Sequence, residues 1–536
     1  MSHLFLFLWA ASVGAQEPAR VGQIEIQRID VFDTAHPDEN RPPYTWVNKL
    51  HILTRESVVR REILLEPGDT FDPYLVENSE RNLRAYPFIK SAQIEPWDRP
   101  DGTVGLMVRV QDTWTTDISP SIGFAAGEQK FGMLLRERNF LGRGKTLETN
   151  YNDGFGTVSR GFSYRDPRVW GSRLSARLYH SNSSQGYDTE VSLALPVYSL
   201  LTPYSTGVQG RHGTTVDPIY KSGEEVARIR EEYRGYEAFV GHPLTATSRR
   251  AVRSTYGYAF VENVFGSSVT GSSFALPDDR RLSMIKWTVD YEESDYFSDN
   301  LINKFELIED INLGWQAQAR LAYASRDLGA LRNEVLPRLT VRKGQRLGPR
   351  QFLLEGGGVY FIYGDSQWRH VVASAYGSYY RKSFLIPKNT LVIHGEIANG
   401  LRLQRDSQLM LGGNAGLRGY RFNAFTGTRS LLFNAESRFY AIEDWLHIVS
   451  IAPILFWDAG YVWSEGEQRK ARDLKHNVGL GLRLGFTRSA TVPVVRMDLS
   501  YAPNKEGTVG GGWVFSAGIH HTFDFADNAL RRVSRD

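Results

Sequence analysis

The sequence contains no cysteine among its 536 residues. This absence excludes a disulfide framework, a zinc finger and any thiol chemistry. A dominant charge is also missing, because 63 basic and 60 acidic residues leave a formal net charge of only +3. So small an excess of positive charge is not typical of a nucleic-acid-binding protein. We therefore expect no nucleic acid among the partners of this chain.

Long hydrophobic runs are missing too. No stretch approaches the roughly 18 apolar residues of a transmembrane helix, and the mean hydropathy is −0.35. The chain is instead rich in residues typical of long twisted strands and tight turns, with 26 Tyr, 28 Phe, 12 Trp and 50 Gly. A membrane-spanning form is therefore expected only as a β-barrel, whose alternating strands are hydrophilic on average.

The N-terminus has the pattern of a secretory signal peptide. An apolar core runs from Leu4 to Val13, and Val13-Gly14-Ala15 is an acceptable small-residue cleavage site. No Lys or Arg precedes the core, which is a defect in the pattern. The prediction is a signal peptide over residues 1–15, and the alternative is a frayed hydrophobic end.

Residues 21–112 have the pattern of a small α+β unit. A short strand is followed by a helix expected over residues 55–64, and a second helix is capped by Asp72 with Pro73 at its first position. Two strands follow, joined by a turn at Asp101-Gly102. The predicted order is β-α-α-β-β, and the segment over residues 33–53 makes an unusually long link to the first helix.

Residues 114–525 are predicted to be mainly β. Segments of about ten alternating residues repeat between Gly, Asp, Asn, Pro and Ser, and 16 to 19 candidate strands can be marked. In the last strand, one side is apolar and aromatic: Trp513, Phe515, Ala517, Ile519, Phe523 and Phe525. This pattern indicates a transmembrane antiparallel barrel rather than a soluble β-sandwich. Residues 526–536 form a C-terminal tail.

A glycine-rich segment carries the strongest functional signal. It reads Gly412-Gly413-Asn414-Ala415-Gly416-Leu417-Arg418-Gly419-Tyr420. Carboxylates follow on the next two strand-like segments, at Glu436 and within Phe456-Trp457-Asp458-Ala459-Gly460. Gly416 and Gly419 flank Arg418 and permit a tight loop conformation that other residues would strain.

Strand parity predicts where these side chains point. If the apolar parity faces lipid, the opposite parity lines the lumen with both signs of charge: Glu436, Arg438, Asp458, Arg483, Arg496 and Asp498. A loop arginine folded inward could then pair bidentately with a carboxylate and act as a latch. Parity does not show whether Arg418 pairs with Glu436 or with Asp458. A charged lumen by itself is also compatible with a porin.

Taken in order, these motifs resemble the BamA/TamA superfamily of outer-membrane assembly and translocation barrels. The N-terminal unit resembles one POTRA domain, through Gly68-Asp69-Thr70-Phe71, Tyr86-Pro87-Phe88-Ile89 and Gly102-Thr103-Val104. Further motifs are Asn139-Phe140-Leu141-Gly142 and the Arg-Gly-Tyr loop with the later Phe-Trp-Asp-Ala-Gly. The resemblance covers nearly the whole mature chain, although Leu417 stands where Val is more usual.

The resemblance implies a sixteen-stranded barrel in the outer membrane of a Gram-negative bacterium, with the N-terminal unit in the periplasm. It implies a latch in which Arg418 meets Asp458, with Glu436 a second candidate partner and Leu417, Gly419, Tyr420 and Gly460 around it. It also implies a weak lateral seam between the first strand, about Thr115–Phe124, and the last, about Trp513–Phe525. Pro120 removes one ladder hydrogen bond in the first, and Gly518, Phe523 and Phe525 lie in the last.

The expected function is insertion, assembly or translocation of proteins at the outer membrane. The expected partners are outer-membrane lipid and unfolded outer-membrane or secreted client proteins, engaged at the POTRA-like edge and the seam. Neither the oligomeric state nor the clients follow from the sequence. A passive porin or solute channel and a surface adhesin are the alternatives. The chain departs from the pattern of the assembly relatives in two ways. It has only one POTRA-like unit, and a tail follows Phe525.

Enzyme chemistry is not expected. Gly142-Arg143-Gly144-Lys145-Thr146 lacks the first glycine of a P-loop, and neither Gly-x-Ser-x-Gly nor His-Glu-x-x-His occurs. We therefore predict no catalytic residue, no metal and no cofactor.

Overall fold

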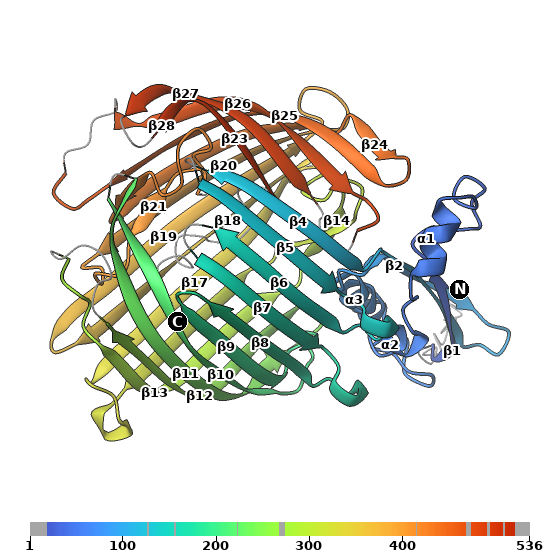
Figure 1. Ribbon diagram of the computed structural model, residues 1–536. Coiled ribbons are helices and arrows are strands. Elements are labelled where there is room, and N and C mark those ends of the chain that lie inside the picture. Colours follow the sequence, from blue (N-terminus) through green and yellow to red (C-terminus); the bar gives the residue numbers. More distant parts are fainter. Residues whose placement is uncertain are drawn as a thin grey trace, which may run out of the picture.

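The computed structural model describes residues 19–519, except 126–127, 155–156, 222, 267–273, 414, 468–472, 490–493 and 507–509. The predicted signal peptide over residues 1–15, Asn414, Phe523, Phe525 and the tail over residues 526–536 lie outside the described residues. A small N-terminal unit is followed by a large antiparallel sheet that curls into a barrel shape (Figure 1). Within the described part of the chain, no helix has the length and apolar character needed to span a membrane.

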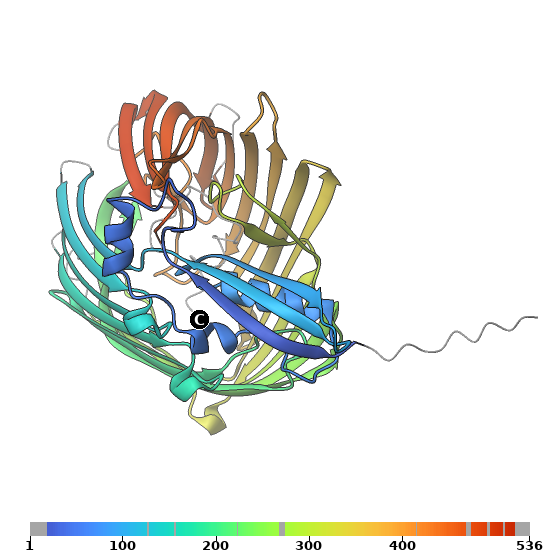
Figure 2. The same ribbon diagram turned by 90° about the vertical axis from the view of Figure 1, so that its right-hand side faces the viewer.

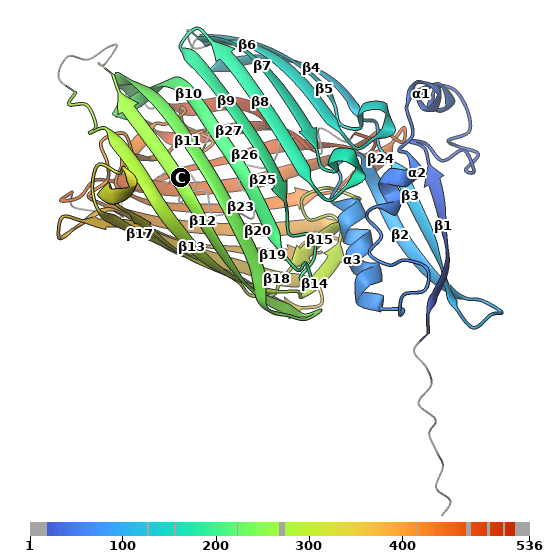
Figure 3. The same cartoon turned by 90° about the horizontal axis from the view of Figure 1, so that it is seen from below.

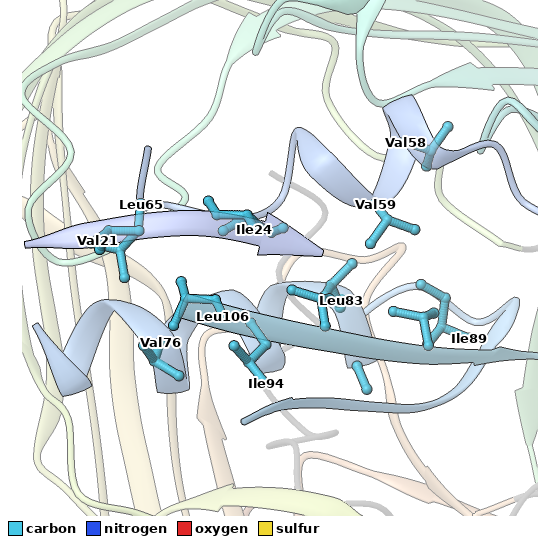
Figure 4. Close-up of a cluster of buried hydrophobic side chains, with 14 of the residues drawn as sticks. Val21, Ile24, Val58, Val59, Leu65, Val76, Leu83, Ile89, Ile94 and Leu106 are labelled. Carbon is cyan, nitrogen blue, oxygen red and sulfur yellow. The ribbon is translucent and has the colours of Figure 1, made fainter. Parts of the chain in front are cut away.

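The N-terminal unit packs helices against a three-stranded sheet. Its elements are β1 (Val21–Ile29), α1 (Tyr44–Leu50), α2 (Glu56–Arg60), α3 (Pro73–Arg84), β2 (Ile89–Asp98) and β3 (Val104–Asp112). The strand order is β1-β3-β2, with β3 parallel to β1 and antiparallel to β2. Figure 4 shows the core between helices and sheet, where Val59, Leu83 and Leu106 are fully buried.

Two features of this unit differ from the sequence prediction. The helix expected over residues 55–64 is only the short α2, and the long link before it contains the additional helix α1. The second predicted helix is α3, and its cap is as expected because the Asp72 side chain accepts a hydrogen bond from the Tyr74 N–H.

The barrel strands are long and pair in sequence order, apart from two small insertions. The first half contains β4 (Thr116–Ala125), β5 (Glu128–Glu137), β6 (Thr146–Gly154), β7 (Thr157–Asp166), β8 (Ser175–Ser183), β9 (Gly186–Leu195), β10 (Ser205–Lys221), β11 (Glu224–Ala246), β12 (Arg250–Phe265) and β13 (Arg280–Glu293). The second half contains β16 (Gln316–Ala324), β17 (Glu334–Gly348), β18 (Gln351–Gly364), β19 (Gln367–Lys382), β20 (Asn389–Leu401), β23 (Arg429–Phe439), β24 (Ile442–Trp445), β25 (Val449–Trp463), β26 (Lys475–Phe486), β27 (Val495–Glu506) and β28 (Gly510–Ile519). Two short hairpins interrupt this order, β14 (Tyr296–Asp299) with β15 (Glu309–Asn312) and β21 (Leu409–Leu411) with β22 (Phe425–Gly427).

The expected count of sixteen strands is not confirmed. The curled sheet includes β4 to β13, β16 to β20 and β23 to β28, which makes 21 strands among the described residues. One of these, β24, has four residues and pairs with β25. The first half contains six of them, β4 to β9, each of nine or ten residues.

The first and last strands become neighbours when the sheet curls. The strand order places β28 beside β4. Other strands that follow one another along the sheet, such as β4 and β5 or β27 and β28, share a residue-by-residue register. For the described residues, no such register joins β28 to β4. Pro120 lies within β4 opposite Met133, and Gly518 lies within β28 opposite Arg496.

The N-terminal unit lies across one mouth of the barrel (Figure 2). Two turns of the barrel hold it there. Asn139 donates from its amide to the Thr54 hydroxyl at 2.8 Å, and the Arg55 N–H donates to the Gly142 carbonyl at 2.9 Å. At the next turn on this rim, Arg168 pairs with Glu62, a buried carboxylate that also accepts from the Tyr86 hydroxyl at 2.7 Å. The Asn-Phe-Leu-Gly motif therefore docks the unit to the barrel.

Asp112 gives this docked unit a predictable pH dependence. Its carboxylate accepts from both the N–H and the hydroxyl of Thr54 at 2.7 Å, and burial raises its pKa to about 6. The folded unit therefore binds a proton more tightly than the unfolded chain, whose aspartates titrate near pH 4. Its stability should fall by about 2–3 kcal/mol as the pH rises from about 4 to about 6, and then stay level.

Asp112→Asn should remove this slope, because an amide has no charge to lose. The measurement is hydrogen-exchange protection of β3 amides between pH 4 and 7, corrected for intrinsic exchange. An equal slope in both proteins would contradict the assignment.

Candidate functional site

The glycine-rich segment belongs to a long loop that enters the barrel. This arginine loop, residues 402–428, connects β20 to β23 and contains the hairpin of β21 and β22. Leu417 and Tyr420 are 0% and 1% exposed and pack in an apolar cluster with Leu432 of the wall. The Tyr420 hydroxyl donates to the His476 carbonyl at 3.2 Å. The loop therefore packs tightly against the strands of the barrel wall.

Arg418 is fully enclosed by acidic and aromatic side chains. Its guanidinium donates to both Asp458 carboxylate oxygens, at 2.9 and 2.7 Å, and to Glu436 at 2.7 Å. The guanidinium carbon lies 3.5 Å from the centre of the Phe456 ring. The structure thus brings Arg418 to both candidate carboxylates, and the bidentate contact is with Asp458.

The two carboxylates have further partners on the barrel wall. Asp458 accepts from the amides of Asn434 and Asn477 at 2.7 and 2.9 Å. Glu436 accepts from Arg438 at 2.8 Å and from Arg483 at 3.1 Å. Asp498 lies 3.8 Å from Arg418 and extends the cluster to Arg483 and Arg496. Four strands, β23, β25, β26 and β27, therefore contribute to one buried charge network.

Strand parity explains why the cluster lies inside. Leu431 and Trp457 are each 43% exposed on the outer face, whereas the neighbouring Leu432 and Asp458 are buried. Asn434 and Asp458 are paired directly across β23 and β25, so their side chains share the inner face.

Glycine is required at two positions around Arg418 for different reasons. Gly416 has φ of +96°, and a Cβ there would approach Leu432 to 2.5 Å. Gly419 has ordinary backbone angles, but a Cβ would approach the Asn477 side chain to 2.6 Å. Gly460 on β25 contacts this loop, where a Cβ would come within 3.2 Å of Leu417. Close packing therefore accounts for Gly419 and Gly460, and backbone conformation for Gly416.

A second segment enters the barrel from the mouth covered by the N-terminal unit. This inner hairpin, residues 296–312, contains β14 and β15 and lies inside the ring of strands in Figure 2. Ile302 and Phe305 are 0% and 2% exposed. A Cβ at Gly485 on the wall would approach the Phe305 ring to 2.3 Å. This segment was not predicted from the sequence, although its apolar residues in a long connection were a signal.

Arg438 connects the inner hairpin to the arginine loop. It donates to the Ile302 carbonyl at 2.5 Å and to the Asn303 side chain at 3.0 Å, and from its Nε to Glu436. Glu436 in turn binds Arg418. The two inward segments are therefore linked through Arg438 and Glu436, both on β23.

The inner hairpin also contacts the N-terminal unit. Arg84 of α3 donates twice to Asp310, at 2.9 and 3.0 Å, and this pair is largely buried. The Arg81 guanidinium lies 4.6 Å from the centre of the Tyr296 ring. A continuous series of contacts therefore runs from α3 through the hairpin and Arg438 to Arg418.

One other acidic cluster lies where the N-terminal unit meets the rim. Glu39, Asp444 and His447 bring three potential ligand atoms within 4.8 Å of one another. Arg488 occupies this cluster, pairing with Glu39 at 2.6 Å and Asp444 at 3.3 Å. The arrangement is an ion-pair network that fastens the unit to the barrel.

Comparison with known sequences found one partial match to a curated protein and no family model. Over 200 residues it is 26% identical to the "Putative outer membrane protein assembly factor" of Treponema pallidum (strain Nichols), a match that covers 35% of this chain and 22% of that relative. The chain therefore spans less than a quarter of the relative's length.

Two solved structures are similar over most of the chain. CdiB from Acinetobacter baumannii has a TM-score of 0.47 at 12% identity, covering 94% of this chain and 74% of that one. BamA from Haemophilus ducreyi lacking POTRA domains 1–3 has a TM-score of 0.37 at 11% identity, covering 94% and 86%.

Proposed function

We propose that this chain is an outer-membrane assembly or translocation barrel of the BamA/TamA superfamily. It inserts, assembles or translocates proteins at the outer membrane of a Gram-negative bacterium. Residues 21–112 are its single POTRA-like domain in the periplasm, and residues 114–525 are its barrel. The named function of the Treponema relative supports this proposal.

The observation that carries the proposal is the buried cluster around Arg418. A passive solute channel needs an open lumen, whereas this barrel holds two inward segments that are linked through Arg438 and Glu436. A buried ion network contributes little net stability, and its best-attested use is to fix one arrangement among several. We infer that Arg418, Asp458 and Glu436 form a latch that sets the position of the arginine loop.

The lateral seam is the second part of the proposal. Weak pairing of β4 with β28 would let client strands add to an open edge, since exposed strand edges pair readily with other chains. Pro120 supports this because it cannot donate to a ladder.

Depletion of the protein followed by outer-membrane proteomics tests the function. We expect the levels of several other barrel proteins to fall several-fold, and to recover when the wild-type chain is supplied. Unchanged levels of every other barrel protein would contradict a general assembly role. A porin role would instead predict a steady wide conductance in planar bilayers that does not depend on residues 21–112.

A further inference from the structure

Helix α1 carries apolar side chains on its exposed side. Trp46 and Leu50 lie one helical turn apart and are 60% and 75% exposed, and Ile52, just after the helix, is 54% exposed. The opposite side of the helix packs into the unit through Tyr44 and Val47. We call Trp46, Leu50 and Ile52 the α1 patch. Large apolar side chains grouped on an exposed surface indicate contact with a partner.

The exposed face of the sheet in the same unit has the opposite character. On this face Arg109 donates to Gln27 at 3.2 Å and to Glu95 at 2.9 Å. Gln93 lies opposite Arg109 in the register of β2 and β3 and is also exposed. The water-facing side of the sheet is therefore polar, and the α1 patch needs a separate explanation.

Helix α1 lies at the rim of the barrel, between two turns. The Tyr44 hydroxyl donates to the Leu446 carbonyl at 3.1 Å, in the turn between β24 and β25. Beyond the helix, the Arg55 N–H donates to the Gly142 carbonyl at 2.9 Å, in the turn between β5 and β6. Figure 3 shows α1 beside β24 at this end of the barrel. In the sheet order β26, β27, β28 and β4 lie between the two turns, so α1 is next to the ends of the first and last strands.

The two rim turns expose apolar side chains of their own. Trp445 and Leu446 are exposed at the first turn, and Phe140 and Leu141 at the second. On the wall between them, β26 exposes Leu480 on its outer face. A transmembrane barrel presents such an outward apolar surface to lipid, and tryptophan is enriched where this surface meets the headgroups. The α1 patch therefore adjoins the lipid-facing surface at its rim.

The charge of the segment around the patch suits a phospholipid surface. Residues 41–55 contain three basic residues, Arg41, Lys49 and Arg55, and no acidic residue. Exposed aromatic and aliphatic side chains beside basic ones are typical of segments that lie in the membrane interface, where cations meet anionic headgroups. A protein partner would not require this charge bias.

We propose that the α1 patch inserts into the periplasmic leaflet of the outer membrane, beside the rim ends of β4 and β28. Its partner is phospholipid, with Trp46 at headgroup level and the aliphatic side chains among the acyl chains. The proposal rests on the outer-membrane location proposed above. This contact gives the N-terminal unit a hold on the membrane in addition to its hydrogen bonds with the barrel turns, and it places bulky side chains among the lipids next to the seam.

Labels at single cysteines test this contact, because the natural chain has no cysteine. The full-length protein is reconstituted in vesicles of phosphatidylethanolamine and phosphatidylglycerol, with and without lipids that carry a nitroxide quencher near the headgroup end of the acyl chain. A nitrobenzoxadiazole label at Ile52→Cys should be quenched several-fold. The same label at Gln93→Cys, on the polar face of the sheet, should be almost unaffected. Leu480→Cys on the barrel wall reports whether the barrel itself lies in the bilayer.

A double variant tests whether the patch causes the insertion. Trp46→Gln with Leu50→Gln replaces two exposed side chains and should reduce the quenching at Ile52→Cys to the level of Gln93→Cys, with no change at Leu480→Cys. Replacing Trp97, an exposed tryptophan of β2, by Gln is the matched control and should leave the quenching at Ile52→Cys unchanged.

The three label positions separate the possible failures. Quenching at Leu480→Cys without quenching at Ile52→Cys would overturn the lipid contact of α1 and leave the outer-membrane location intact, with a protein as the occupant of the patch. Absence of quenching at both positions would overturn the membrane location and this contact with it. Quenching at both, combined with unchanged barrel-protein levels after depletion, would overturn the assembly function and support the contact.

Discussion

Arg418→Ala will sharply lower the temperature at which the folded barrel unfolds in semi-native gels. The substitution leaves the buried Asp458 without its guanidinium partner, whereas Glu436 keeps Arg438 and Arg483. Removing one partner of a buried ion pair costs about 3–5 kcal/mol, because the remaining charge stays uncompensated. It also leaves an empty space beside Phe456, whose ring packs on the guanidinium. A wild-type melting profile for this variant would contradict the latch.

The control variants separate charge from loop flexibility. Arg421→Ala removes an arginine three positions later in the same loop, where the side chain is exposed, and should leave the melting profile unchanged. Arg418→Lys keeps a charge but cannot donate to both oxygens of Asp458 in the planar geometry of a guanidinium. It should fall between Arg418→Ala and wild type.

The positions of the latch residues could be predicted from the sequence because strand alternation is a local property. Apolar neighbours such as Leu431 and Trp457 identify the outer face, and this places Glu436 and Asp458 opposite. The choice of partner could not be predicted, because it depends on how deeply the loop enters. In the structure the loop reaches far enough for Arg418 to contact both carboxylates.

Strand alternation predicted neither the number of strands nor helix α1. Strands joined by a two-residue turn, such as β8 and β9, merge easily when only alternation is followed. Helix α1 follows Pro42-Pro43 in a segment that has the composition of a linker, and its inner side is set by packing of Tyr44 against Phe32. Tertiary contacts outweigh local propensity in so short a helix.

The inner hairpin was missed because its structure depends on the wall around it. Its strands have four residues each, too short to show a period. Its buried contacts are with residues far along the chain, such as Arg438 and Tyr440, which both donate to the Ile302 carbonyl. An isolated hairpin of this size is marginal in water, so the barrel interior stabilises it.

Removing the inner hairpin should raise the conductance of the barrel several-fold in planar bilayers. Glu292 of β13 pairs directly with Gln316 of β16, so the two strands can be joined by a tight turn without the hairpin. Replacing residues 295–313 by Asn-Gly provides such a turn, since this dipeptide favours two-residue hairpin connections. The replacement deletes the buried Ile302 and Phe305, which fill space beside the wall, while the strand pairing stays.

A control variant changes the inner hairpin without removing its buried residues. Ile308→Ala changes a 43% exposed residue of the hairpin and should leave conductance at the wild-type level. The replacement also removes both acceptors on the hairpin for Arg438, so this arginine keeps Glu436 as its acidic partner. Equal conductance of the hairpin-free protein and wild type would contradict the prediction and show that the inner hairpin does not obstruct the lumen.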